Sequence, residues 1–296
     1  MIYSIDLRQH EPLNTTVMND PFDTTLPNAF LVSALSSPLM PAQHLAMLGQ
    51  QSPVNGIEID LQDTLRYRLQ GWHSASAAER TAVRAVWFPP PLENKLSPQV
   101  EHLIQHRQQS GLPVTLIVDQ PRRRTRDAIR NQITFAIKLR TRLPASTRIA
   151  IGVRPHQIEN TRAHLANLAG LRLQASEWDI DIALDLGREL DWLWEAEAAI
   201  YRVIGSLGMI RLSYPTNTFD GRFRASLTQR AITSCSELGY TRDFSLMVPL
   251  PWWHWRNSRA LQAACREASA GIERQLKATA AAFDFERQAD RFADRS

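Results

Sequence analysis

The chain has 296 residues, of which 44% are hydrophobic, and a single α/β barrel commonly reaches about 250 residues, so its length does not require two domains. The net charge is only +4 and 30 acidic residues are spread along the chain, which argues against a dedicated nucleic-acid surface. The chain is arginine-rich, because only three of its 34 basic residues are lysine.

The N-terminus lacks the basic and apolar regions of a signal peptide, and no run approaches the roughly 18 apolar residues of a membrane span. Cys235 and Cys265 lie in helical stretches without a metal-ligand or paired redox spacing, which is typical of a reducing compartment. We therefore expect a cytoplasmic protein without a membrane partner.

Residues 1–28 are polar and contain three prolines, which predicts an N-terminal arm. Eight short strand-like runs follow, at 29–35, 54–60, 82–88, 113–119, 148–154, 179–186, 208–214 and 244–250. Segments with helical spacing lie between them, such as 97–109, 125–143 and 224–239. A strand followed by a helix eight times over predicts parallel strands with right-handed crossovers.

A closed (β/α)8 barrel, or TIM barrel, over 29–275 is the expected α/β fold of this single domain. An open doubly wound sheet is the second choice, weakened because no glycine-rich phosphate loop follows the early strands. Residues 276–296 predict a C-terminal helical extension. Its apolar stripe of Phe285, Ala289 and Phe292 either packs on the barrel or forms an oligomer contact.

Side chains alternate along a strand, so the uniformly apolar row of each run faces the helices and the other row faces the barrel interior. This rule turns charged residues of both signs inward. The charged residues are Glu58, Asp60, Arg84, Asp119, Arg148, Arg154, Asp181, Asp185 and Arg211, and the uncharged Ser213 also faces inward. Buried charge is costly unless it is paired, so these residues must form ion pairs, be hydrated or bind a ligand.

Active sites of this fold lie at the C-terminal ends of the strands. Asp60, Asp119, Arg154, Asp185 and Ser213 are predicted to lie at that end. Glu58, Arg84, Arg148, Asp181 and Arg211 lie deeper, where we expect structural ion pairs, with Arg148 or Arg211 as the partner of Asp181.

Two loops add chemistry at the predicted mouth. After the fourth strand, Arg122 and its arginine neighbours crowd a helix start, which makes either an anion clamp or a solvated face. After the eighth strand, PLPWWHWRN places Trp252, Trp253, His254 and Trp255 together, either as a sugar-binding wall or as packing. We expect at least two of the three tryptophans to pack.

The segments NGIEID (55–60) and ALDLGREL (183–190), within the eightfold layout, resemble the xylose isomerase-like barrels, the sugar phosphate isomerase/epimerase and endonuclease-IV-like superfamily. The resemblance implies a divalent metal held by a glutamate of the fifth strand, an aspartate of the sixth, a histidine near the seventh and a glutamate of the eighth. Of these ligands the sequence retains only Asp185.

The other matching positions depart from that pattern. The fifth strand offers Gly152 or Arg154, the seventh Arg211 and Ser213, and the eighth Pro249. One carboxylate among arginines cannot hold a divalent cation, so we expect neither a metal nor another cofactor. A rearranged cage of His156, Asp185 and His254 is the alternative.

These features predict a divergent sugar isomerase/epimerase-like barrel that binds a small anionic or carbohydrate ligand at its C-terminal mouth. Asp185, with Asp119 or Glu58, would be the general base. The ligand-binding candidates are Arg154, Arg211, Arg122, Ser213, His156, Trp252 and His254. A non-catalytic scaffold barrel is the alternative, and a metal-dependent sugar phosphate isomerase/epimerase with a rearranged site is the second alternative, so catalysis is left open.

Overall fold

The computed structural model describes residues 29–89, 96–119, 126–153, 161–186, 196–213, 219–248 and 250–293. Eight parallel strands pair in sequence order, and the last pairs with the first, so the predicted closed (β/α)8 barrel is confirmed. The strands are β1 (Phe30–Ser33), β2 (Val54–Asp60), β3 (Val83–Phe88), β4 (Val114–Val118), β5 (Thr147–Val153), β6 (Asp181–Leu186), β7 (Leu207–Ser213) and β8 (Asp243–Met247).

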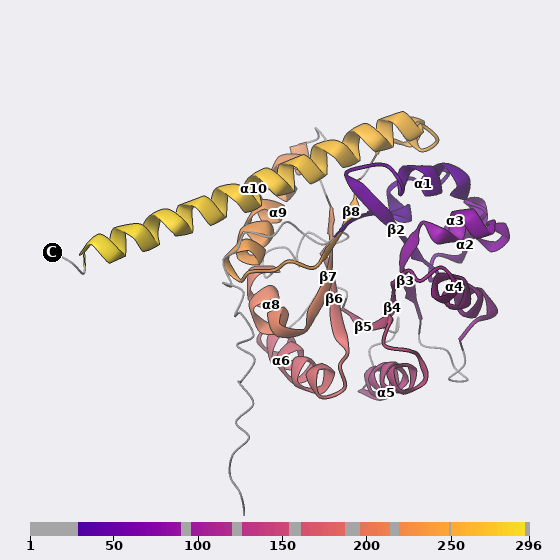
Figure 1. Ribbon diagram of the computed structural model, residues 1–296, viewed down its shortest axis with the longest axis horizontal. Helices are drawn as coiled ribbons and strands as arrows, with labels where there is room; N and C mark the ends of the chain where they lie inside the picture. The colour runs from indigo at the N-terminus through magenta and orange to yellow at the C-terminus, as the bar shows by residue number, and fades with distance from the viewer. Residues whose placement is uncertain are drawn as a thin grey trace, which may run out of the picture.

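The helices surround the strands (Figure 1). They are α1 (Ala42–Leu48), α2 (Thr64–Leu69), α3 (Ala77–Thr81), α4 (Pro98–Gln109), α5 (Arg126–Arg142), α6 (Thr161–Glu177), α8 (Ala196–Val203), α9 (Phe219–Glu237) and α10 (Ser258–Ala293). Short 3-10 turns occur at Ala34–Ser36, Trp72–Ser74, Ile204–Ser206 and Trp252–His254. Within the part of the chain described, no helix is long and apolar enough to cross a membrane.

Local sequence explains several helix starts. Ser76 and Glu79 form a reciprocal capping box at α3, and the Asp63 carboxylate accepts a hydrogen bond from the backbone N–H of Arg66 at α2. Helix α4 begins with Ser97 as the capping residue and Pro98 in the first turn, where the missing N–H of proline costs nothing.

Two apolar layers hold the barrel together. The larger one lies between the strands and the helices. The smaller one fills the barrel interior with Ala29, Leu31, Ala85, Trp87, Ile117, Ala150, Ala183 and Met209. Gly152 on β5 makes room for Trp87, because a Cβ atom there would lie 2.6 Å from the Cζ3 atom of the indole.

The side chain of Arg84 packs against Gly56 on β2, where an added Cβ atom would collide with it, so the predicted inward direction of Arg84 is not contradicted. The pairing of β2 with β3 shifts register between Ile57 and Glu58, so Ala85 and Trp87 face the interior. Arg84 lies at the start of β3 beside this irregularity, and its guanidinium donates a hydrogen bond to the backbone oxygen of Asn55. A β-bulge changes which residues face inward, and alternation counted along one strand does not reveal it.

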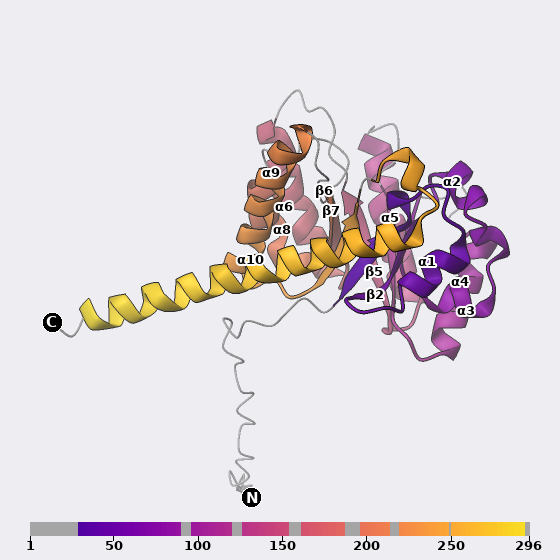
Figure 2. The same cartoon turned by 90° about the horizontal axis from the view of Figure 1, so that it is seen from above.

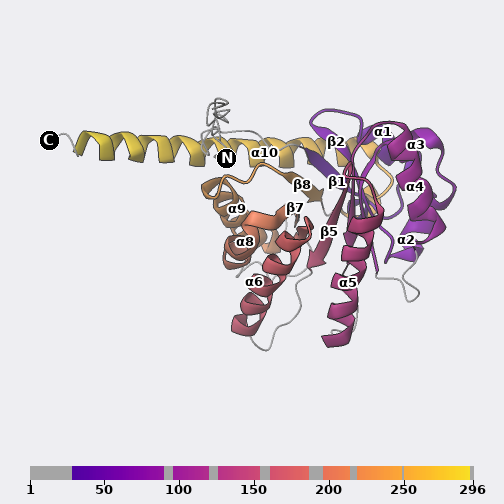
Figure 3. The same ribbon diagram turned by 60° about the horizontal axis from the view of Figure 1, so that its bottom comes forward.

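Helix α10 is continuous across the division that we placed at 275/276. Its first half packs on the barrel through the buried side chains of Leu261, Cys265, Ala268 and Ile272. Its second half projects beyond the rest of the molecule, as seen from two further directions (Figure 2, Figure 3). The N-terminal arm lies outside the described residues, as do the side chains of Phe285, Ala289 and Phe292.

Candidate functional site

Arg211 is the centre of a charged cluster inside the barrel. Its side chain projects from β7 and is fully buried. It donates hydrogen bonds to both carboxylate oxygens of Glu58 on β2, and its Nη1 lies 2.6 Å from the Asp185 carboxylate on β6. Arg211 therefore connects strands that are far apart in the sequence, and the expected deep ion pairs are confirmed for Glu58 and Arg211.

Further groups complete this cluster, which we define as Arg211, Glu58, Asp60 and Asp185. The Asp60 carboxylate lies 3.8 Å from the Arg211 guanidinium, which stacks 4.2 Å above the Trp87 ring centroid. Ser245 donates a hydrogen bond to Glu58.

The acidic groups of the cluster outnumber its single guanidinium three to one, and all four side chains are buried. Burial alone would lower the pKa of Arg211, but the carboxylates of Asp185, Glu58 and Asp60 raise it well above its usual value. Arg211 is therefore a permanent cation.

A second ion-pair group lies toward the N-terminal ends of the strands. Arg148 on β5 is 2.8 Å from Asp181 on β6 and 3.3 Å from Asp243 on β8. It also donates to the backbone oxygen of Gly208 on β7. The expected ion pair of Arg148 with Asp181 is confirmed, so these inward charges neutralise one another inside the barrel.

Two further predicted residues lie at the C-terminal ends of their strands. Asp119 directly follows β4 and is fully buried. Its backbone N–H donates a hydrogen bond to the backbone oxygen of Phe88. Ser213 ends β7 and is 2% exposed, and its hydroxyl has no hydrogen-bond partner within the described residues. Ser213 thus offers a hydroxyl group to whatever occupies the mouth.

The divalent metal that the resemblance implies does not fit these residues. Asp185 is the only ligand position retained, and its carboxylate is paired with the Arg211 guanidinium, which would repel a metal cation. Among the described residues no group of three or more His, Cys, Asp or Glu side chains is placed to hold a metal ion. The alternative cage falls partly outside the described residues, since His156 does.

The rim is described in part. Arg122, Arg154 and His156 lie outside the described residues. Trp252 and Trp253 are 72% and 64% exposed and meet edge to face, so the expectation that at least two tryptophans pack is wrong.

The third tryptophan of that loop is half-buried. Trp255 donates its ring N–H to the backbone oxygen of Leu250, while His254 beside it is also half-buried. The loop thus has one half-buried indole, that of Trp255, and two exposed ones.

Sequence reasoning missed three members of the interior network: Trp87, Asp243 and Ser245. The bulge concealed Trp87, and the eighth run was begun one residue too late to include Asp243. Ser245 could have been found, because it alternates with the apolar residues Phe244 and Leu246.

Solved structures share this fold. The D-allulose 3-epimerase of Methylomonas sp. superposes with a TM-score of 0.51 at 15% identity, covering 84% of this chain and 99% of that one. The expected likeness to xylose isomerase-like barrels is confirmed for the fold. The probable 3-DHS dehydratase AsbF of Bacillus anthracis has a TM-score of 0.49 at 10% identity, covering 80% of this chain and 97% of that one. The D-psicose 3-epimerase of Clostridium cellulolyticum H10 has a TM-score of 0.46 at 12% identity, covering 88% of this chain and 98% of that one.

Neither a protein-family model nor a curated protein matches the chain. At identities this low the structural likeness shows the TIM barrel fold alone, so any chemistry must be argued from the residues themselves.

Proposed function

We propose that this barrel binds a small carbohydrate at its C-terminal mouth without a divalent metal. The observation that carries the proposal is the group of three carboxylates that surrounds Arg211 among the described residues. Carboxylate oxygens accept hydrogen bonds from sugar hydroxyls, and a neutral or singly charged sugar brings many such donors. Trp252 and Trp253 offer exposed aromatic faces near the end of β8, which suit sugar C–H groups.

Within this proposal the described residues divide the work. Asp60, Asp119 and Asp185 accept hydroxyl donors, and Ser213 contributes the hydroxyl that the protein itself leaves unpartnered among the described residues. Arg211 holds Glu58 and Asp185 in place, so their positions do not depend on the ligand. Binding of an anionic sugar would depend on Arg122 and Arg154, which lie outside the described residues.

A thermal-shift screen tests the proposal. Neutral sugars, sugar acids and sugar phosphates are added separately at equal ionic strength, because a ligand of the native state raises the melting temperature by mass action. We expect a neutral sugar or sugar acid to raise it. If no sugar does, the barrel is a scaffold protein, which is the alternative that its closed ion-pair network would then favour.

The Ser213→Ala variant locates the ligand. Because the Ser213 hydroxyl makes no hydrogen bond within the described residues, its removal should leave the free protein as stable as before while weakening the response to sugar by about tenfold in Kd. Ser245→Ala is the matched control: it removes a hydroxyl bound to Glu58 and should lower the stability of the free protein. A full sugar response in Ser213→Ala would contradict this placement.

Catalysis is the second candidate, with Asp185, Asp119 or Glu58 as general base. A carboxylate that abstracts a proton beside a sugar carbonyl exchanges it with solvent. Incubating the bound sugar with protein in deuterium oxide and recording its proton NMR spectrum tests this, since loss of a C–H signal indicates abstraction. An unchanged spectrum with a bound sugar would identify a binding barrel.

A further inference from the structure

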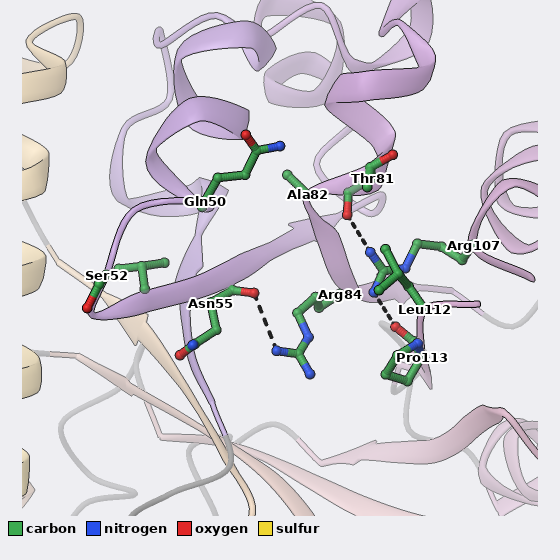
Figure 4. A pocket seen from close by; sticks show the side chains of 11 residues that line it. Gln50, Ser52, Asn55, Thr81, Ala82, Arg84, Arg107, Leu112 and Pro113 are labelled. Carbon is green, nitrogen blue, oxygen red and sulfur yellow. Dashed lines mark hydrogen bonds between the residues drawn. The ribbon is translucent and has the colours of Figure 1, made fainter. Parts of the chain in front are cut away.

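A pocket opens at the opposite end of the barrel from the mouth. It is lined by Gly49, Gln50, Ser52, Val54, Asn55, Thr81, Ala82, Arg84, Arg107, Leu112 and Pro113, with a volume of about 580 Å³. These residues come from the segments that lead into β2, β3 and β4 and from α4 (Figure 4). The volume is typical of small-molecule sites.

The pocket lining contains two arginines and no acidic residue. Arg107 on α4 is 2% exposed, and its guanidinium donates to the backbone oxygens of Thr81 and Pro113 (Figure 4). These carbonyls fix the side chain but do not neutralise it. Its Nε–H has no partner within the described residues.

Arg84 is the second cation. It is half-buried, and its hydrogen bond to the backbone oxygen of Asn55 is long at 3.4 Å. Burial raises the pKa of the Asp243 carboxyl and the charge of Arg84 opposes this rise in part, but Asp243 forms its ion pair with Arg148. Burial and the charge of Arg84 together lower the pKa of Arg107 to about 10, so the two cations repel each other.

We propose that this pocket binds a small molecule through a phosphate group held by Arg84 and Arg107. A phosphate dianion neutralises both guanidinium groups, and the planar fork of arginine matches its oxygens. Gln50, Ser52 and Thr81 add neutral polar groups to the lining. Because a buried cation requires counter-charge, one buried and one half-buried guanidinium in a pocket lining without an acid favour an anionic occupant.

Isothermal titration calorimetry of the full chain with inorganic phosphate and with pyrophosphate tests the proposal. Ionic strength is held constant with sodium chloride, because salt screens exposed charge. We expect Arg84→Gln to weaken phosphate binding by about tenfold or more. Arg202→Gln, which removes the same charge from an exposed position on α8, should change it less than about twofold.

Leu112 allows an independent test because it lines the pocket and is 39% exposed. Leu112→Glu places a carboxylate beside the two arginines, so it should raise the melting temperature of the free protein and abolish the response to phosphate. Leu112→Gln has nearly the same shape and should keep that response. Equal phosphate binding by wild type, Arg84→Gln and Leu112→Glu, or no binding by wild type, would overturn the proposal.

The two ligand sites can be told apart. Ser213→Ala should retain phosphate binding at the N-terminal pocket, whereas Arg84→Gln should retain the sugar response at the mouth. Failure of one site therefore leaves the test of the other intact.

Discussion

At the scale of single residues, Arg211 decides the character of the barrel interior. A buried cation that contacts three carboxylates compensates charge that could not otherwise remain there. Each of the carboxylates would have to take up a proton or water if the guanidinium were absent. The stability of the protein should therefore depend on Arg211 far more than on its exposed arginines.

Replacing Arg211 with Met tests this dependence. The variant leaves buried carboxylates without their cation, so we expect the free energy of unfolding to fall by roughly 3–5 kcal/mol, as measured by urea denaturation. Arg230→Met is the control, because the Arg230 pair with Glu197 is exposed to solvent and should cost less than about 1 kcal/mol. Similar losses in both variants would refute the central role of Arg211.

Asp243 gives the protein a pH dependence. Burial raises the pKa of its carboxyl, although Arg148 and Arg84 lower it in part. Folding then favours the protonated carboxyl, so its contribution to stability is complete below the unfolded value of about 3.9 and is lost as the pH rises through the raised folded value.

The variant Asp243→Asn mimics the protonated form. Its unfolding free energy relative to that of wild type should therefore increase as the pH rises above the unfolded value of about 3.9. Chemical denaturation at a series of pH values measures the difference. A relative decrease over this range would show that the ion pair with Arg148 outweighs burial.

At the scale of elements, Gly152 on β5 leaves space inside the barrel for the Trp87 side chain of β3. Gly152→Ala would bring a methyl group against the Trp87 ring, so we expect a loss of about 1–3 kcal/mol from overpacking. Gly170→Ala on α6 is the matched control: its Cβ meets nothing within 4 Å, and alanine is the better helix former by roughly 1 kcal/mol. In thermal unfolding, the melting temperature should fall for Gly152→Ala and rise for Gly170→Ala.

The same elements show how far sequence reasoning reaches. Alternation placed Arg148, Asp181, Asp185 and Arg211 in the interior, because β5 and β6 keep a regular apolar row and β7 keeps one from Ile210 to Leu212. It missed Trp87 on β3, where the pairing with β2 passes over Arg84, since a register shift depends on pairing. The reach of Arg211 across to Glu58 also could not be predicted, because it depends on strand heights and side-chain rotamers.

At the scale of the whole molecule, the protein should be indifferent to divalent metals. The guanidinium of Arg211 lies against the one retained ligand, Asp185, so a cation would meet repulsion there. We expect elemental analysis of purified protein to find no stoichiometric divalent metal, and a chelator to leave its melting temperature unchanged. A stoichiometric metal lost on replacing Asp185 with Asn would contradict the argument.

The stacked ion pairs inside the barrel have a further consequence for how its strands find one another. An apolar strand can slide by two residues against its neighbour and still bury the same face. Here a slide of β7 by two residues would separate Arg211 from Asp185, and a slide of β5 would separate Arg148 from Asp181. We expect these charges to fix the strand register, because a misaligned barrel would separate Arg211 from Asp185 or Arg148 from Asp181 and leave buried charge unpaired.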